Sequence, residues 1–282
     1  MDIAFYQERL NLKEAYFARI DHEDAMVAIV YRITKVDGTS LILKISEREK
    51  DYFRERLFLK HLEGKFIPKI IQVIPPQTGI HGAILMECLQ GDLLTELTQA
   101  LSNELGRALA LIHNNYLSGY GDPVENLNND PRAYFTLKFE EGLEECKNHL
   151  SASLIDACKK YFNSHFPSKV DGPCIVHRDF RPGNILVSNG TLLGIIDWAG
   201  ARASFAEEDF CSIQDWVNPY MNDFLSGYSS IRPIPSYRPL IPFLRLNKAI
   251  ATIGFLIKRN TWDNKDSRLY QFHRRYLDKL LS

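Results

Sequence analysis

Two short segments contain the side chains whose types and spacing best suit chemistry: HRDFRPGN at 177–184 and IDW at 196–198. Asp179 and Asn184 belong to the first segment, and Asp197 belongs to the second. A carboxylate and an amide oxygen suit Mg²⁺ when phosphates and water complete its coordination shell. Asp179 is then left to accept a proton from an attacking hydroxyl. Together these side chains indicate phosphoryl transfer.

The elements between the two segments explain how these side chains would meet. Residues 185–188 (ILVS) and 191–196 (TLLGII) flank an Asn-Gly pair at 189–190, a strong signal for a tight hairpin turn. Pairing the two runs brings Asp197 back beside Asn184. Taken singly, Asp and Asn are common turn residues, so each could have only a local role. Their joint spacing around a hairpin favours a functional site.

The first ninety residues are predicted to form a small, β-rich lobe. Alternating apolar residues predict strands at 15–20, 26–34 and 40–46, and apolar runs predict two more at 66–75 and 82–89.

A helix is predicted directly after the third strand. Ser46 and Glu49 form a capping box at its start, and Gly64 ends it. Lys44 of the third strand points away from the face taken by its neighbours, because side chains alternate along a strand. A lysine in a strand is often only a surface charge. With a helix that contains Glu55 directly after it, a functional position is favoured.

Beyond Gly91 the chain is predicted to be mainly helical. Helices are expected at 94–101, 104–115, twice within 133–165, at 207–227 and at 246–281. Four prolines within 231–242 predict a rigid loop. The expected fold class is α+β. Residues 1–90 would form an antiparallel, β-rich N-terminal part, and residues 91–282 a larger helical part.

The composition argues against several other classes of protein. The chain has 282 residues, 45% of them hydrophobic, and a formal net charge of −1, so no positive surplus points to nucleic acid. Its five widely spaced cysteines predict reduced, buried thiols. The first residues lack the apolar region of a secretion signal, and no apolar run approaches the ~18 residues of a membrane span. We therefore expect a cytoplasmic protein with no membrane partner; the oligomeric state is left open.

HRDFRPGN followed by IDW resembles the catalytic core of the aminoglycoside phosphotransferase family. This protein-kinase-like group also includes choline, homoserine, methylthioribose and fructosamine kinases. The resemblance implies a bilobal protein-kinase-like fold with ATP in the cleft between the lobes. Residues 1–90 would be the nucleotide-binding lobe, and residues 91–282 the lobe with the catalytic loop and the acceptor site. It also implies that Asp179 is the catalytic base and that Asn184 and Asp197 bind Mg²⁺.

The same resemblance implies supporting roles for other residues. Lys44 would hold the α- and β-phosphates, and Glu55 would hold the lysine. His177 would be a structural member of the catalytic loop, and Asp209 would support that loop from the start of a helix. Arg181 could stabilise charge on the transferring phosphoryl group, although an exposed arginine that covers the loop fits equally well.

The resemblance also predicts how adenine is bound, and where the chain departs from the pattern. Met86 would be the gatekeeper, and the carbonyl of Glu87 and the N–H of Leu89 would contact adenine, although an edge strand ending in a turn fits this segment too. The phosphate-covering loop, 21–26 (DHEDAM), has no glycine and contains three acids. There is no DFG and no following APE, which disfavours a protein kinase.

The predicted function is an ATP- and Mg²⁺-dependent transfer of the γ-phosphate to a hydroxyl of a small molecule, as in aminoglycoside phosphotransferases. One alternative is a metabolite kinase of the choline, homoserine or fructosamine type. The other is a non-catalytic, nucleotide-binding pseudokinase, which only the missing glycines support.

The acceptor would lie near the catalytic loop, against residues 120–165 and the helices after Asp197. Residues 201–230 contain five acids and one base and would suit a cationic acceptor, but a solvated helix face is favoured. Residues 231–282 contain eleven bases and three acids. Four aromatic residues recur at helical spacing, for which core packing is favoured over a box around a cation or a sugar: Trp216, Tyr220, Phe224 and Tyr228.

Overall fold

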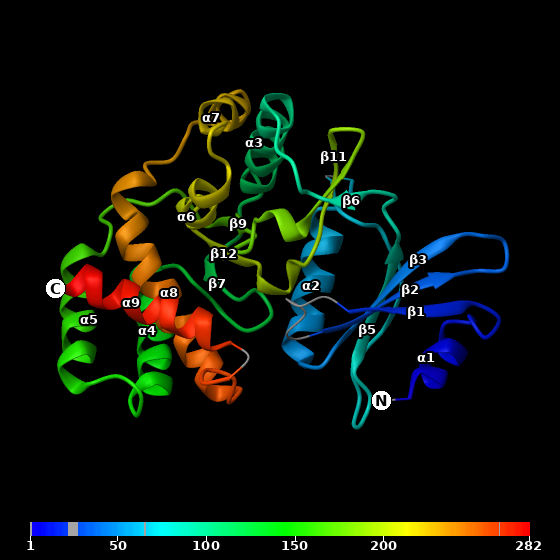
Figure 1. Ribbon diagram of the computed structural model, residues 1–282, viewed down its shortest axis with the longest axis horizontal. Coiled ribbons are helices and arrows are strands. Elements are labelled where there is room, and N and C mark those ends of the chain that lie inside the picture. Colours follow the sequence, from blue (N-terminus) through cyan, green and yellow to red (C-terminus); the bar gives the residue numbers. More distant parts are fainter. Residues whose placement is uncertain (1, 22–27, 65, 265) are drawn as a thin grey trace.

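The computed structural model describes residues 2–21, 28–64, 66–264 and 266–282 (Figure 1). Its N-terminal part is an antiparallel sheet of five strands in the order β1-β2-β3-β5-β4. The strands are β1 (Tyr16–Ile20), β2 (Ala28–Thr34), β3 (Ser40–Ser46), β4 (Ile70–Ile74) and β5 (Gly82–Glu87). All five predicted strands are therefore confirmed, and β4 and β5 are shorter than expected.

Each face of this sheet is covered by one helix. Helix α1 (Ile3–Arg9), which the sequence analysis missed, buries Tyr6 against one face, in a cluster that includes Leu43 and Ile45. Helix α2 (Glu49–His61) packs on the other face, where Tyr52 and Phe58 meet Ile84. Since Lys44 pairs with Ile84 in the sheet, it projects on the α2 side, as predicted.

The predicted capping box at the start of α2 is wrong. Ser46 is the last residue of β3, where it pairs with Gly82 and is buried. Arg48 takes the N-cap position, and no side chain caps the first turn. The pairing of β3 with β5 extends as far as Ser46, so this serine is part of the sheet and does not cap the helix.

The rest of the chain is mainly helical, as predicted. Its helices are α3 (Gln99–His113), α4 (Pro131–Cys146), α5 (Ala152–His165), α6 (Glu207–Trp216), α7 (Met221–Ser229), α8 (Ile241–Lys258) and α9 (Ser267–Leu281). The predicted helix at 94–101 is largely wrong, because α3 begins only at Gln99, after the N-cap Thr98. The two long helices predicted at 207–227 and 246–281 are each divided into two.

Short strands and turns place the segments of the site. The strands β10 (Ile185–Ser188) and β11 (Thr191–Ile195) form the predicted hairpin, and β6 (Asp92–Leu93) pairs with β10. At the turn, Asn189 and Gly190 have φ values of 51° and 76°, as a tight turn of this kind requires. A second small sheet has the order β8-β7-β12-β9, with strands β7 (Tyr120–Gly121), β8 (Leu127–Asn128), β9 (Cys174–Val176) and β12 (Arg202–Ser204). Three 3₁₀ turns lie at Pro182–Asn184, Trp198–Gly200 and Arg238–Leu240.

One prediction about apolar segments needs correction. Arg238–Lys258 is the one helical stretch in the described part of the chain that is long and apolar enough to cross a membrane, and half of its apolar window is buried in the protein. Its apolar side chains, such as Phe243 and Ile250, belong to the core cluster formed with α4 and α5. Four of the five cysteines are buried, as predicted, and Cys88 is partly buried.

Candidate active site

A cavity of about 590 Å³ lies where the N-terminal sheet meets the β10–β11 hairpin. Strand residues such as Val30 and Ile42 line one side of it, and Leu186 of β10 lines the other. The lining includes Met86, which pairs with Ile42, and Lys44, two positions further along β3. Beside these apolar strand side chains, the lining has a charged end formed by Lys44, Glu55 and Asp197, and Arg32 lines it near Met86.

Lys44 lies in the centre of the charged end. Its Nζ is 2.9 Å from Oε1 and 2.7 Å from Oε2 of Glu55, and 2.7 Å from Oδ1 of Asp197. Burial alone would lower the pKa of Lys44, but the two carboxylates outweigh it and hold this pKa above its ordinary value. The lysine is therefore a fixed positive charge within the cavity wall.

Asp197 follows β11 and has an unusual backbone conformation. Its φ of 64° lies in the left-handed region, which costs free energy for a residue with a side chain and is concentrated at functional sites. Its carboxylate lines the cavity, and the charge of Lys44 is the main reason that its pKa is lowered. Asp197 is therefore ionised and can face a cation.

The hairpin brings Asp197 beside Asn184, as the sequence predicted. The N–H of Ile196 donates to the carbonyl of Asn184 at 2.9 Å. The side-chain Nδ2 of Asn184 donates to Asp179, to its carbonyl at 2.9 Å and to its Oδ2 at 2.7 Å. Since the amide nitrogen is used in this way, the amide oxygen is the group of Asn184 available to a metal ion.

The oxygen atoms of Asn184 and Asp197 suit a Mg²⁺ ion whose other ligands are not protein side chains. Within residues 2–21, 28–64, 66–264 and 266–282, no three or more His, Cys, Asp and Glu side chains gather as a metal cluster. Asp197 and Asn184 offer two oxygen ligands at the charged end of the cavity. Mg²⁺ is bound in this way where phosphates and water supply its other ligands.

Asp179 lies at the open side of the charged end. Its side chain is 42% exposed, and Arg181 Nε is 3.1 and 3.0 Å from its two carboxylate oxygens. Arg181 also lines the cavity, with its side chain 34% exposed. The arginine therefore lies between the cavity and the carboxylate, where it could face a phosphoryl group as well as Asp179.

His177 joins the catalytic loop to the segment before Asp197. Its Nε2 donates to the carbonyl of Ile196 at 3.0 Å, and its Nδ1 accepts the N–H of Asp179 at 3.3 Å. The side chain is fully buried and lies edge-on against Trp198, with ring centroids 4.5 Å apart. The histidine therefore holds the two segments against each other.

Asp209 lies in the first turn of α6 and binds the backbone of the catalytic loop. It accepts the backbone N–H of His177 at 2.8 Å and that of Arg178 at 2.6 Å. The second of these residues has a φ of 68°, again in the left-handed region. The buried carboxylate thus fixes a strained turn directly before Asp179.

A second layer of contacts behind Asp209 was not predicted from the sequence. His113 of α3 contacts it at 3.1 Å through Nε2, and Tyr228 of α7 lies 2.8 Å from His113 Nδ1. Burial lowers the pKa of His113. For Asp209 burial acts to raise the pKa, but the contacts with His113 and His177 outweigh it and lower this pKa. A neutral histidine therefore donates to an ionised aspartate, and the tyrosine hydroxyl donates to the histidine.

The predicted hinge residues lie along the cavity. Met86, Glu87 and Leu89 all line it, and Met86 is buried. The side chain of Glu87 turns back, since its Oε1 accepts the N–H of Lys69 at 2.8 Å. The contacts of the Glu87 carbonyl and the Leu89 N–H with adenine remain a prediction. The glycine-free loop at 21–26 lies outside the described residues except for Asp21.

The acids and aromatic residues after Asp197 do not together line one side of an acceptor site. Glu207 and Asp209 are buried, and Asp215 forms an ion pair with Arg245. Phe224 and Tyr228 are fully buried in the core, as favoured from the sequence. The acidic segment therefore consists of carboxylates with separate structural contacts.

Comparison with known proteins agrees with this geometry. A model of the phosphotransferase enzyme family matches residues 27–240. A thermostable mutant of aminoglycoside phosphotransferase APH(4)-Ia, solved with AMP-PNP and hygromycin B, is similar with a TM-score of 0.74 at 13% identity, over 99% of this chain and 97% of that one. A putative fructosamine-3-kinase from Thermobifida fusca YX-ER1 has a TM-score of 0.68 at 19% identity, over 90% and 93% of the two chains.

A spectinomycin phosphotransferase, APH(9)-Ia, solved with ADP and spectinomycin, has a TM-score of 0.62 at 19% identity, over 98% and 94% of the two chains. A search of curated proteins found no match. The fold and the site define a small-molecule phosphotransferase with a protein-kinase-like, α+β fold. The chain belongs to the phosphotransferase enzyme family. The predicted family, fold class and enzyme class are thereby confirmed.

Proposed function

We propose that the protein uses Mg²⁺ and ATP to phosphorylate a hydroxyl group of a small molecule. One observation carries the proposal: a single cavity brings together Lys44, Glu55, Asn184 and Asp197, and Asp179 is hydrogen-bonded to that group. These five side chains come from four separate parts of the chain. A phosphoryl-transfer site of the protein-kinase type uses each of these residue types.

The nucleotide would occupy the cavity with its base at the Met86 end. Adenine would contact the carbonyl of Glu87 and the N–H of Leu89, between the apolar sides of the cavity. The α- and β-phosphates would bind Lys44, which Glu55 holds in place. The bound AMP-PNP and ADP in two of the similar structures support ATP as the donor.

Mg²⁺ would be held by Asp197 and by the amide oxygen of Asn184. When bound, the ion would supply positive charge to the phosphate oxygens and orient them. Asp197 has two carboxylate oxygens, so it can keep its contact with Lys44 through Oδ1. The fixed charge of the lysine and the ionised aspartate thus occupy the same end of the cavity before the nucleotide arrives.

Asp179 would position the acceptor hydroxyl and take its proton. The hydroxyl oxygen forms the new bond to the γ-phosphorus while the bond to the β,γ-bridging oxygen breaks, and ADP leaves. Asn184 and Arg181 hold the carboxylate that receives the proton. Arg181 would also face the negative charge of the transferring group.

The acceptor is proposed to be a small molecule with a free hydroxyl group. Residues 1–90 and 91–282 would form the two lobes, with the acceptor entering beside Asp179. Both an antibiotic, as named for the aminoglycoside phosphotransferases, and a metabolite, as named for the fructosamine kinase, are compatible with an open site. A cytoplasmic location remains a prediction.

The test is ATP consumption by the purified protein with Mg²⁺ and a panel of acceptors. The panel contains aminoglycosides, choline, ethanolamine, homoserine, methylthioribose, fructosamines and simple sugars. A product that forms with the wild type and not with Asp179→Asn supports the proposal. If Mg-ATP neither binds nor reacts, the enzyme proposal fails, and the non-catalytic alternative fails with it unless ATP binds without metal.

A further inference from the structure

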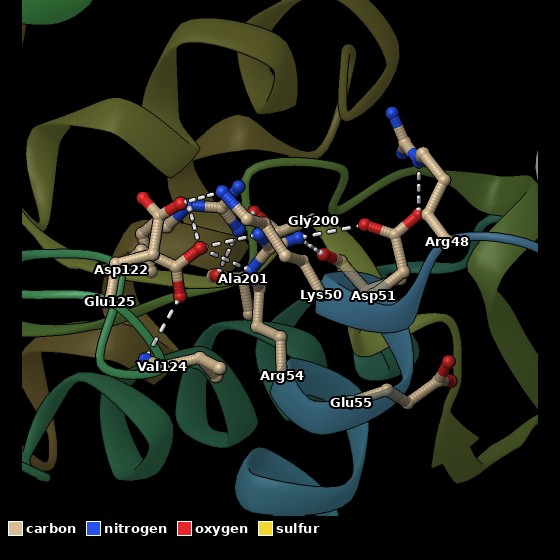
Figure 2. A network of polar contacts seen from close by, with 12 residues as sticks. Arg48, Lys50, Asp51, Arg54, Glu55, Asp122, Val124, Glu125, Gly200 and Ala201 are labelled. Carbon is tan, nitrogen blue, oxygen red and sulfur yellow. Dashed lines mark hydrogen bonds and ion pairs between the residues drawn. The ribbon is translucent and has the colours of Figure 1, made fainter. Parts of the chain in front are cut away.

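A buried network ties helix α2 to two segments of the C-terminal part (Figure 2). Arg54, one position before Glu55, has a side chain that is only 6% exposed. Its Nε donates to Oδ2 of Asp122 at 3.1 Å, and its Nη2 donates to the same oxygen. Figure 2 shows Arg54 pointing toward Asp122, while Glu55 points away from the network. The two neighbouring residues therefore hold different partners on different sides of α2.

The same guanidinium group reaches the segment that follows Asp197. Its Nη1 donates to the carbonyl of Ala199 at 2.6 Å and to Oδ1 of Asp51 at 3.0 Å. Ala199 lies two residues after Asp197. Arg54 thus connects the helix that holds Lys44, through Glu55, to the turn that presents Asp197.

Asp122 is itself held firmly. It is buried, its Oδ1 accepts the N–H of Val124 at 3.1 Å, and Arg202 Nε lies 3.8 Å from its Oδ2. Burial would raise the pKa of Asp122, but the contacts with Arg54, Arg202 and the Val124 N–H outweigh it and lower this pKa. The anchor of Arg54 is consequently a charged carboxylate at a fixed place.

A second ion pair links the same helix to the same loop but lies at the surface. Lys50 contacts Glu125, and their side chains are 67% and 33% exposed. An exposed pair of two flexible side chains fixes little, because water screens the charges. It is a natural control for the buried pair.

We propose that Arg54 and Asp122 form a strut that sets the position of α2, and with it Lys44 and Glu55, relative to Asp197. Arg54 is then a positioning residue for phosphoryl transfer, and α2 is held in its working position without a further activating event. The inference rests on the proposed function. It requires arginine, because lysine offers one nitrogen in place of the planar fork that serves Asp122, Ala199 and Asp51 together.

The experiment compares Arg54→Lys and Asp122→Asn with Lys50→Gln. Hydrolysis of Mg-ATP, or transfer to an acceptor found in the panel, gives kcat and KM. We expect kcat to fall about 100-fold in both strut variants, the effect of misplacing reacting groups by about 1 Å, with a smaller change in KM. We expect Lys50→Gln to retain the kcat and KM of the wild type.

A second readout does not depend on turnover. The rate at which an amine-directed acylating reagent labels Lys44, measured by mass spectrometry, reports whether the lysine keeps its buried contacts. We expect labelling to be roughly tenfold faster in Arg54→Lys and Asp122→Asn than in the wild type and in Lys50→Gln, at temperatures where all four proteins are folded. An unchanged labelling rate together with an unchanged kcat would overturn the inference.

Combination with Glu55→Gln separates positioning from stability. If the strut acts through Glu55, Arg54→Lys lowers kcat much less in the Glu55→Gln background than in the wild type. Equal losses in both backgrounds would overturn the route through Glu55, and loss of folding in both strut variants would make the pair a stability element only. If the wild type itself lacks Mg-ATP turnover, the proposed function has failed, and the labelling of Lys44 still decides the inference.

Discussion

The two halves of the candidate site are built differently. On the nucleotide side, the side chains of Lys44 and Glu55 are 11% and 2% exposed and paired with each other. On the acceptor side, those of Arg181 and Asp179 are 34% and 42% exposed. The fold therefore fixes the lysine–glutamate pair that handles the phosphates. It leaves open both the proposed metal ligand Asp197, whose side chain is 46% exposed, and the part that meets the acceptor. A similar nucleotide half can then serve many acceptors. The site therefore identifies the type of reaction but not the substrate.

Removing the carboxylate of the acceptor half should have a large effect on kcat alone. We expect Asp179→Asn to lower kcat by about 10²- to 10⁴-fold, because the proton acceptor is lost. The KM for ATP should stay near the wild-type value, since Asp179 lies outside the cavity lining. Steady-state kinetics at several ATP concentrations measures both quantities. Full activity in this variant would remove Asp179 from its proposed role.

Removing the carboxylate of the nucleotide half should abolish binding as well as turnover. Asp197→Ala deletes the charged metal ligand and one partner of Lys44, so calorimetric titration should give no Mg²⁺-dependent ATP binding. Asp215→Asn, an exposed aspartate on α6, is the matched control and should bind as the wild type does. Tight Mg-ATP binding by Asp197→Ala would contradict the division into two halves.

Removing Asp209, which holds the catalytic loop, should lower the free energy of unfolding. Asp209→Asn leaves the N–H groups of His177 and Arg178 without their carboxylate, and we expect the free energy of unfolding to fall by about 3 kcal/mol. Because its pKa is lowered in the folded state, Asp209 stabilises the fold above its unfolded pKa of ~4 and loses this contribution as pH falls further. Urea unfolding at pH 7 and pH 3 measures the effect, with Asp215→Asn as the control. Equal stability of the two variants would contradict it.

Arg181 should have a smaller effect than either aspartate. Arg181→Met removes the charge beside Asp179, and we expect kcat to fall roughly 100-fold with ATP binding retained. If Arg181→Lys restores most of the rate, charge is what matters, and if it does not, the arginine geometry is required. Wild-type kinetics for Arg181→Met would show that the arginine only covers the loop.

Part of the acid sensitivity should arise outside both halves. Burial and the charge of Lys248 lower the pKa of His273 in α9 to about 4, so the unfolded chain takes up a proton that the folded chain does not. Stability should therefore decrease as pH falls from ~6.5 toward ~4, by about 2 kcal/mol between pH 7 and pH 5. His273→Leu should flatten this dependence in urea titrations. An unchanged slope would place the sensitivity elsewhere.

The sequence predicted the parts of the molecule that local signals determine. The Asn-Gly turn and its two apolar runs are adjacent in the chain, so the hairpin and the meeting of Asn184 with Asp197 followed from spacing. The position of Lys44 on the α2 face followed from strand alternation. Because these features depend on neighbours in the chain, short-range patterns were sufficient.

The remaining features depend on contacts between distant residues. Asp122 meets Arg54 across 68 positions, and His113 meets Asp209 across 96. No local pattern distinguishes a buried, paired arginine from a surface one. The mistaken cap at Ser46 has the same origin, because pairing of β3 with β5 commits that residue to the sheet. The acceptor class likewise depends on side chains that come together only in the fold.

Thermal unfolding with Mg-ATP tests the central claim most directly. Ligand that binds the folded protein at 100 times its Kd stabilises it by about 2.7 kcal/mol, so we expect a clear rise in Tm for the wild type and for Asp179→Asn. Asp197→Ala should show no Mg²⁺-dependent rise. No rise in the wild type, or an equal rise in Asp197→Ala, would contradict a Mg-ATP site in this cavity.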